Sequence, residues 1–227
     1  MNHSLTKSNH KGLDMTDVQY MTHMGDDDLV TDAARVSFDK QAENYGPARN
    51  AGLIAFLARE NHLHPFSHPQ ATFRCSTSIF ISRQLAKHQV GGTWNEVSRR
   101  YVKSSPSYWK PDFFRSAAPD VKQGSNPEAH RRSEEFLEEY HDICIDAIAT
   151  YNKMVALGIC AEQARGILPQ GVITEWVWTG SLLFWSRVYN LRIKPDAQRE
   201  VQEFAELLGE QMASLFPISW QELTRNG

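Results

Sequence analysis

Two long segments of the sequence carry apolar residues three and four positions apart, which is the spacing of one face of an α-helix. They cover residues 127–157 and residues 196–215. A helix with such a stripe has to bury it against another part of the chain. The second segment is expected to close the fold, with a stripe made of Val201, Phe204, Ala205, Leu208, Met212 and Leu215. We therefore predict a fold in which helices dominate.

Shorter helices are predicted in the first half of the sequence. The acidic residues 26–28 are placed to cap the first of them. Residues 47–61 have a broad apolar face, with a proline in the first helical turn. Residues 78–89 return to helical spacing until Gly91 and Gly92 stop it. The segment after these two glycines is expected to be extended.

Two further segments have the pattern of β-strands. Residues 68–77 alternate apolar with polar side chains, and residues 171–180 are rich in β-branched and aromatic residues. Another helix is predicted from Ser181 to about Asn190. Residues 103–126 are rich in serine, proline and lysine, and we expect them to form a long irregular connection.

These elements add up to an α+β fold, a helix-dominated single domain with a small mixed or antiparallel sheet. The chain has 227 residues, which suits one hydrophobic core. Residues 1–15 lack periodic apolar positions, so we expect a loose N-terminal leader there and a single domain over residues 16–227.

The charge balance argues against nucleic acid as a partner. Lys and Arg total 24 against 27 Asp and Glu, a net charge of −3, so the protein has no overall positive field. No apolar run approaches the roughly 18 to 20 residues that span a bilayer. The polar start of the chain also lacks the apolar stretch of a signal peptide. We expect a cytoplasmic protein without a membrane partner.

The cysteines and histidines do not predict a metal site. The three cysteines are Cys75, Cys144 and Cys160. They are odd in number and lack C-x-x-C spacing, so we expect core thiols rather than disulfides or zinc ligands. Three histidines lie close together at His62, His64 and His68. Pro65 breaks helical geometry between them, and no nearby carboxylate completes a metal signature.

The segment KHQVGGTWNEVSRRYV, residues 87–102, gathers cations, amides and one carboxylate around two glycines. The planar fork of an arginine grips a phosphate in two places, and a neutral amide both donates to and accepts from the edge of a base. The hydroxyl of Ser98 follows a turn, where it can share a phosphate with Arg99 and Arg100. One interpretation is a nucleotide site. The alternative is a solvated, salt-bridged face, which is the commoner reason for an Arg-Arg pair beside a glutamate.

The longer segment RQLAKHQVGGTWNEVSRRY, residues 83–101, resembles the signature of the flavin-dependent thymidylate synthases. In that signature, Arg-His-Arg on a helix is followed by a spacer and then by Asn-Glu-x-Ser-x-Arg-Tyr. Five more pieces match the family in its order and approximate spacing: AARVSF, HPFSH, ARGILP, NLR and AQREVQ, which begin at residues 33, 64, 164, 190 and 197. The resemblance therefore extends over most of the chain.

The resemblance implies an enzyme that uses FAD to transfer a methylene from methylenetetrahydrofolate to carbon 5 of dUMP, with NAD(P)H as reductant. It also implies a homotetramer with shared active sites, and residues 16–227 as one catalytic domain. The residues at the family's nucleotide-binding positions are Gln84, Lys87, Glu96, Ser98, Arg99, Arg100, Arg165 and Arg192. Those at its FAD positions are Ser37, His62, His64, Lys87, His88, Gln89, Glu96, Ser181 and Arg187. Arg192 falls where an arginine ionises the uracil ring, a catalytic role in which a fixed cation stabilises developing negative charge. No metal is implied.

The sequence departs from the family pattern at several of these positions. Lys87 and Gln89 replace the two outer arginines of Arg-His-Arg, which exchanges two planar forks for a point charge and a neutral amide. The spacer to Ser98 is one residue longer. At the FAD positions, Ser181 and Arg187 stand where the family has asparagines.

Three alternatives stay open from the sequence. The same flavin and folate chemistry on UMP or dCMP is one, because the sequence does not reveal how the 2′ position of the sugar is sensed. A synthase with a cysteine nucleophile is another, although all three cysteines lie in apolar or strand contexts. The third is a nucleic-acid-binding module that uses Lys87, Arg99, Arg100 and Lys103 as a backbone patch. The choice between NADH and NADPH is open as well.

Overall fold

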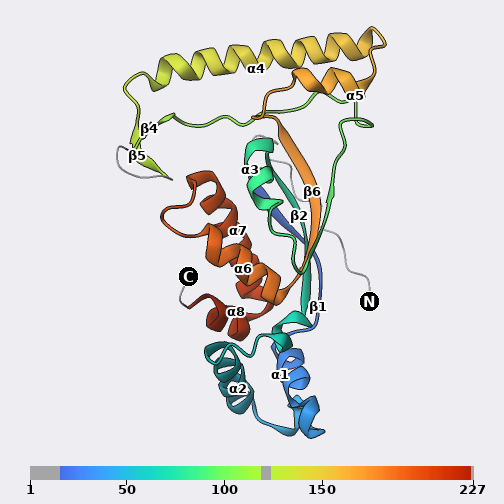
Figure 1. Ribbon diagram of the computed structural model, residues 1–227, viewed down its shortest axis with the longest axis vertical. Coiled ribbons are helices and arrows are strands. Elements are labelled where there is room, and N and C mark those ends of the chain that lie inside the picture. The colour runs from blue at the N-terminus through green and yellow to red at the C-terminus, as the bar shows by residue number, and fades with distance from the viewer. Residues whose placement is uncertain (1–15, 119–123, 226–227) are drawn as a thin grey trace.

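A four-stranded sheet runs through the middle of the molecule (Figure 1). The computed structural model describes residues 16–118 and 124–225, and the leader predicted for residues 1–15 lies outside them. The strand order is β1-β2-β6-β3. The bounds are β1 (Asp17–Met24), β2 (Gln70–Ser78), β3 (Gly92–Glu96) and β6 (Ile173–Ser181). Every neighbouring pair is antiparallel, so the predicted α+β fold with a small antiparallel sheet is confirmed.

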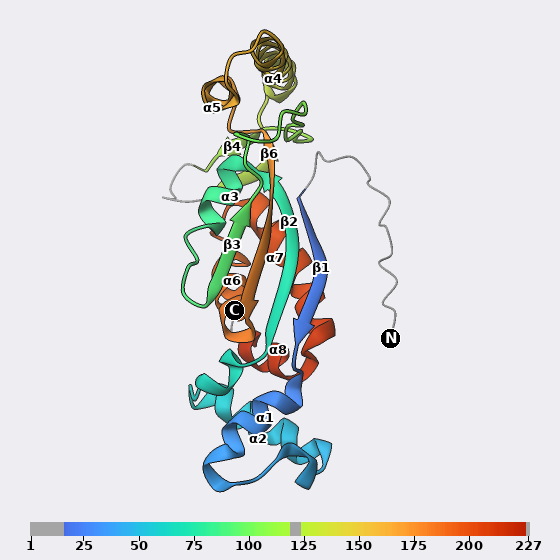
Figure 2. The same ribbon diagram turned by 90° about the vertical axis from the view of Figure 1, so that its right-hand side faces the viewer.

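The C-terminal helices cover one face of this sheet (Figure 2). They are α6 (Leu182–Arg192), α7 (Arg199–Leu215) and α8 (Pro217–Thr224). The stripe predicted on α7 is buried apart from its last member, Leu215, which is half-buried. It meets the aromatic side chains of β6, since Phe204 stacks on Trp176 with 6.0 Å between the ring centroids. Trp178, two residues further along β6, packs edge-on against Trp185 of α6 at 5.0 Å. The core therefore lies between β6 and these helices.

Two helices from the first half of the chain, α1 (Asp27–Arg35) and α2 (Pro47–Arg59), lie together at one end of the molecule (Figure 1). Asp26 caps α1 and Pro47 begins α2, both as predicted. The carboxylate of Asp27 accepts hydrogen bonds from two backbone N–H groups in the first turn of α8, each at 2.9 Å. An anion at the start of a helix is favourable, so this contact stabilises the packing of α1 against the start of α8. Short 3-10 helices complete this end: η1 (Val36–Phe38), η2 (Ala42–Asn44) and η3 (His64–Ser67).

The long helix α4 (Ser133–Ala156) and the short helix α5 (Ala161–Ala164) lie at the opposite end (Figure 1). The helix predicted for residues 127–157 is wrong at its start. The reason is that β5 (Ser125–Ala129) pairs with β4 (Arg115–Ala117) in a separate two-stranded sheet. The connection predicted as irregular over residues 103–126 therefore contains short strands.

Helix α4 leaves much of its apolar surface uncovered within one chain. Cys144 and Ile148 form a small second core with Tyr108. Phe136 and Ile143, in contrast, are 39% and 62% exposed. Exposed apolar side chains gathered on one helix indicate a surface that another molecule covers. Within the described residues, no helix is both long enough and apolar enough to cross a membrane.

Several elements differ from those that the sequence predicts. The edge strand β1 was not expected, because little of it is buried. β3 lies where an extended segment was predicted after the two glycines, but its pairing with β6 in the sheet was not predicted. The helix predicted for residues 78–89 ends early, as α3 (Ile79–Leu85). Lys87 and its neighbours therefore lie in a turn, since this polar stretch has no apolar face to bury. The fold closes with α8, one helix later than predicted.

The two glycines between α3 and β3 are required by the backbone and by a neighbouring ring. Gly91 has a φ angle of 91°, in the left-handed region where a Cβ atom is strained. A Cβ atom on Gly92 would lie 2.5 Å from Cζ of the buried Phe184 ring. The carbonyl of Gly91 accepts a hydrogen bond from the backbone N–H of Ser181 at 3.2 Å. The glycine pair thus allows β3 to begin directly against the end of β6.

Candidate active site

A cavity of about 570 Å³ lies beside α3, the end of β3 and η4 (Arg165–Ile167). It brings together four of the residues predicted to bind the nucleotide, namely Glu96, Ser98, Arg99 and Arg165. Arg83 also lines this cavity and supplies a third guanidinium. Arg83 was not predicted as a site residue, although it is the first residue of the segment that resembles the family signature. Separate segments of the chain therefore converge on one concave, cationic surface.

The pairing of β3 with β6 positions the acidic and hydroxyl groups of this cavity. Glu96 is the last residue of β3, and its carboxylate accepts a hydrogen bond from the hydroxyl of Thr174 at 2.6 Å. The chain then turns, because the carbonyl of Ser98 accepts from the N–H groups three and four residues further on, both at 3.0 Å. The hydroxyl of Ser98 accepts from the N–H of Arg100 at 3.3 Å. The extended exit and polar turn predicted from the sequence are both present.

The arginines around this turn retain donors for a ligand. Arg99 donates to the carbonyl of Ser104 at 2.6 Å, and Arg165 donates through Nε to the carbonyl of Glu162 at 3.3 Å. A guanidinium has five N–H donors, so these contacts leave several free to bind an anion. Arg100 is exposed, lies 3.7 Å from the carboxylate of Glu162 and does not line the cavity. A surface ion pair of this kind contributes about 0–1 kcal/mol, so the solvated-face interpretation fits Arg100 better than Arg99.

Three other predicted residues form a second cluster outside this cavity. Arg192 donates from Nε to Nε2 of His88 at 2.9 Å and from Nη2 to the backbone carbonyl of Gln84 at 3.0 Å. Because a guanidinium cannot accept, the proton of the neutral His88 ring is on Nδ1. Partial burial, together with the charge of Arg192, lowers the pKa of His88 to about 4. Burial also lowers the pKa of Arg192 from its ordinary value.

We predict that His88 makes the stability of the protein depend on pH. The unfolded chain binds this proton near the ordinary pKa of 6.5 and the folded chain only near 4. Stability from this group is therefore complete above pH 6.5 and is lost as the pH falls toward 4. Urea unfolding should show that His88→Gln removes about 1 kcal/mol of the stability difference between pH 7 and pH 5, after allowance for the partial exposure of the ring. The control is His68→Gln at an exposed histidine, which should keep the wild-type difference in unfolding free energy between pH 7 and pH 5. The same difference in His88→Gln as in the wild type would show that His88 does not cause this pH dependence.

Cys75 and Cys144 do not form an activated nucleophile. Cys75 and Cys144 are buried as predicted, but Cys160 is exposed at the start of α5, so the prediction of three core thiols is wrong there. Burial raises the pKa of the Cys75 thiol well above its ordinary value, and burial also raises that of Cys144. A thiol with a raised pKa is a poor nucleophile. Among residues 16–118 and 124–225, no group of three or more His, Cys, Asp or Glu side chains is arranged to hold a metal ion.

Comparison with known proteins adds independent observations on the whole chain. Residues 19–218 match the family described as thymidylate synthase complementing protein. The flavin-dependent thymidylate synthase of Thermosipho melanesiensis is 33% identical over 196 residues, which cover 86% of this chain and 84% of that protein. The flavin-dependent thymidylate synthase of Thermus thermophilus is 31% identical over 208 residues, which cover 92% of this chain and 75% of that protein. The chain belongs to the flavin-dependent thymidylate synthase family.

A solved structure gives the same result for the fold. The UMP/dUMP methylase PolB from Streptomyces cacaoi, bound with 5-Br dUMP, matches with a TM-score of 0.83 and 26% identity, covering 92% of this chain and 95% of that chain. The predictions of family and fold are confirmed, and so is the prediction of a methyltransferase enzyme. Enzymes of this family use FAD, with NAD(P)H and methylenetetrahydrofolate as co-substrates, as the sequence predicts.

The residues predicted to bind FAD come from separate parts of this fold. Exposed side chains of this set are Ser37 on η1, His62 just before η3, His64 at the start of η3, Lys87 and Gln89 in the turn after α3, Glu96 at the end of β3, and Arg187 on α6. Imidazole, ammonium, guanidinium and amide donors suit the phosphates of a dinucleotide, so their chemistry fits FAD. Ser181 differs, because the residue is buried and its hydroxyl caps α6 by accepting from the N–H of Phe184 at 3.2 Å. Of this set, Glu96 alone lines the cavity beside α3.

Proposed function

We propose that this enzyme methylates carbon 5 of dUMP to form dTMP. The observation that carries the proposal is the cationic cavity beside α3. Its volume of about 570 Å³ lies within the usual range of small-molecule sites, about 300–1,000 Å³. Its guanidiniums suit two-point binding of a phosphate. The proposed nucleotide contacts are Gln84, Lys87, Glu96, Ser98, Arg99, Arg100, Arg165 and Arg192.

In this proposal different groups hold the phosphate and the pyrimidine ring. Arg99 and Arg165 bind the phosphate together with the hydroxyl of Ser98. Arg192 lies against the ring, where a fixed cation stabilises the negative charge that develops before carbon 5 attacks. Partial burial strengthens this interaction, because a lower dielectric screens charges less. Bound FAD supplies the redox chemistry, with NAD(P)H as reductant and methylenetetrahydrofolate as carbon donor.

We further propose that the active site is shared between subunits of a homotetramer. Arg192 and Gln84 do not line the cavity that holds Ser98 and Arg99, so a second copy of the chain is the simplest way to complete a site that uses both groups. The exposed apolar residues of α4, among them Ile143, offer a surface that such a copy can cover. Residues 16–227 then form one catalytic domain. The cytoplasmic location and the absence of a nucleic-acid partner stay predictions.

Absorbance and turnover of the purified protein test this function. We expect a bound yellow flavin, and release of dTMP when dUMP, methylenetetrahydrofolate and a reduced nicotinamide are supplied. UMP is the second candidate substrate, because the solved relative PolB is a UMP/dUMP methylase. Parallel assays with dUMP, UMP and dCMP at equal concentrations decide between them. A colourless protein, or a flavoprotein that methylates none of the three, would contradict the proposal.

A further inference from the structure

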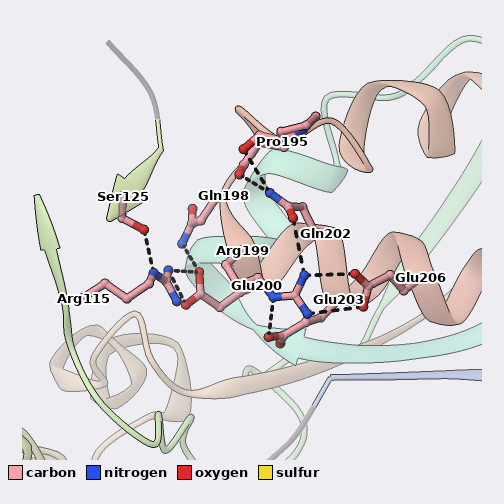
Figure 3. A network of polar contacts seen from close by, with 10 residues as sticks. Arg115, Ser125, Pro195, Gln198, Arg199, Glu200, Gln202, Glu203 and Glu206 are labelled. Atoms are coloured by element: carbon pink, nitrogen blue, oxygen red, sulfur yellow. Dashed lines mark hydrogen bonds and ion pairs between the residues drawn. The ribbon is translucent and has the colours of Figure 1, made fainter. Parts of the chain in front are cut away.

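A chain of polar contacts joins the ion pair of Arg115 and Glu200 to the Arg192 cluster. Figure 3 shows its first part, from Arg115 through Glu200 to Gln198. Arg115 of β4 donates from Nη2 to both carboxylate oxygens of Glu200, at 2.7 and 2.9 Å. The side chain of Glu200 is 7% exposed and lies in the first turn of α7. Gln198 donates from Nε2 to Glu200 at 2.9 Å, and its Oε1 accepts from Nε2 of Gln84 at 2.5 Å. The backbone carbonyl of Gln84 in turn accepts from Arg192.

The carboxylate of Glu200 fixes the orientation of the two side-chain amides that follow it. A carboxylate paired with a guanidinium accepts hydrogen bonds and donates none. Gln198 must therefore turn its NH2 group to Glu200, which leaves its carbonyl oxygen for the next residue. Gln84 must in turn use its NH2 group toward Gln198. The opposite orientation of either amide would leave two acceptors facing each other at half-buried positions, which is unfavourable.

We propose that Arg115, Glu200 and Gln198 are positioning residues that fix the hydrogen-bond polarity of Gln84. With its NH2 group turned to Gln198, Gln84 offers a carbonyl oxygen to the ligand. The group of the nucleotide that meets this oxygen is then a donor, a ring N–H or a sugar hydroxyl, whereas an acceptor such as a phosphate oxygen can meet only the second N–H of the amide. The inference rests on the proposed function, in which Gln84 contacts the nucleotide. The same contacts steady the backbone carbonyl that holds Arg192.

A double-mutant cycle on the flavin-loaded enzyme tests this role. The Kd of dUMP is measured by calorimetry, and kcat and KM by turnover. We expect Gln198→Met and Gln84→Met each to raise Kd and KM about tenfold, because the nucleotide loses a well-placed acceptor in both. The double variant should be no weaker than Gln84→Met alone, since Gln198 acts through Gln84. Gln211→Met, the same substitution further along α7, is the control and should change neither constant more than about twofold.

Two further measurements sharpen the test. Glu200→Gln keeps the shape of the side chain but adds an N–H donor, so Gln198 is no longer held in one orientation. The Kd of dUMP should therefore rise in Glu200→Gln as in Gln198→Met. This variant keeps the test decisive if Gln198→Met folds poorly. Titration with the 3′-deoxy analogue of dUMP identifies the donor. If the 3′ hydroxyl meets Gln84, the effect of Gln84→Met disappears with this analogue, whereas it persists if a ring N–H does.

Clear outcomes would overturn the inference. The positioning role would be excluded if Gln198→Met and Glu200→Gln both bound dUMP with wild-type affinity. It would also be excluded if the losses of affinity multiplied in the double variant. Wild-type turnover would still support the proposed function in either case. A wild-type protein that neither binds nor methylates dUMP or UMP would overturn the proposed function and the positioning role together.

Discussion

Replacing Arg192 with alanine is expected to lower kcat by about 10²- to 10³-fold, the range seen when one group that stabilises transition-state charge is removed. The guanidinium is held by His88 and by the carbonyl of Gln84, so it needs little reorganisation when charge develops on the ring. The fold should survive. A cation in the last turn of a helix contributes only about 0.3–1 kcal/mol to stability.

The measurement is kcat at saturating dUMP, with circular dichroism and thermal unfolding as checks on the fold. Arg225→Ala is a suitable control, because Arg225 is an exposed arginine paired with Glu222 and is remote in sequence from every proposed site residue. It should keep the wild-type rate. Near-normal turnover in Arg192→Ala would remove Arg192 from the mechanism.

Replacing Gly92 with alanine is expected to destabilise the protein by about 1–3 kcal/mol, the usual cost of overpacking a core. The new Cβ atom would lie 2.5, 2.7 and 2.9 Å from three ring atoms of Phe184. This ring is 2% exposed and packs edge-on against Trp178 and Trp185 at 5.3 and 5.0 Å, so it has little room to move. The first residue of β3 would have to shift instead. KM for the nucleotide should then rise, because the same strand carries Glu96.

Urea unfolding of matched variants measures this cost. Gly52→Ala adds the same methyl group to α2, where nothing lies within 4 Å of the new atom. It should leave stability unchanged or raise it by about 0.5–1 kcal/mol, since alanine is the better helix former. Equal stabilities of Gly92→Ala and the wild type would show that β3 is not held against Phe184 as described.

The parts of the fold that the sequence predicts are those with large buried apolar surfaces. The stripe of α7 and the alternation of β2 show burial in their spacing, and both are present. The edge strands β1 and β3 exist because the backbone of a neighbouring strand pairs with them, and this leaves little trace in the side chains. The end of α3 at Leu85 is set by the turn into Gly91, which propensity alone does not reveal.

The candidate site could be predicted only in part, for a related reason. The residue types of the SRRY stretch indicate an anion site, and the structure places Ser98 and Arg99 in a cavity with Arg165. Arg83 lines the same cavity because of where the fold places α3, and no local sequence pattern around Arg83 indicates this. The buried partner of Arg115 is 85 residues away at Glu200, a contact that no spacing rule predicts.

The central claim is that cations from separate segments of the chain converge on one pyrimidine nucleotide. The most direct test is a crystal structure of the flavin-loaded protein with dUMP. We predict a phosphate within hydrogen-bond distance of Ser98, Arg99 and Arg165, with the guanidinium of an Arg192 against the uracil ring. A nucleotide bound elsewhere, or an assembly in which no Arg192 approaches the cavity beside α3, would contradict the account.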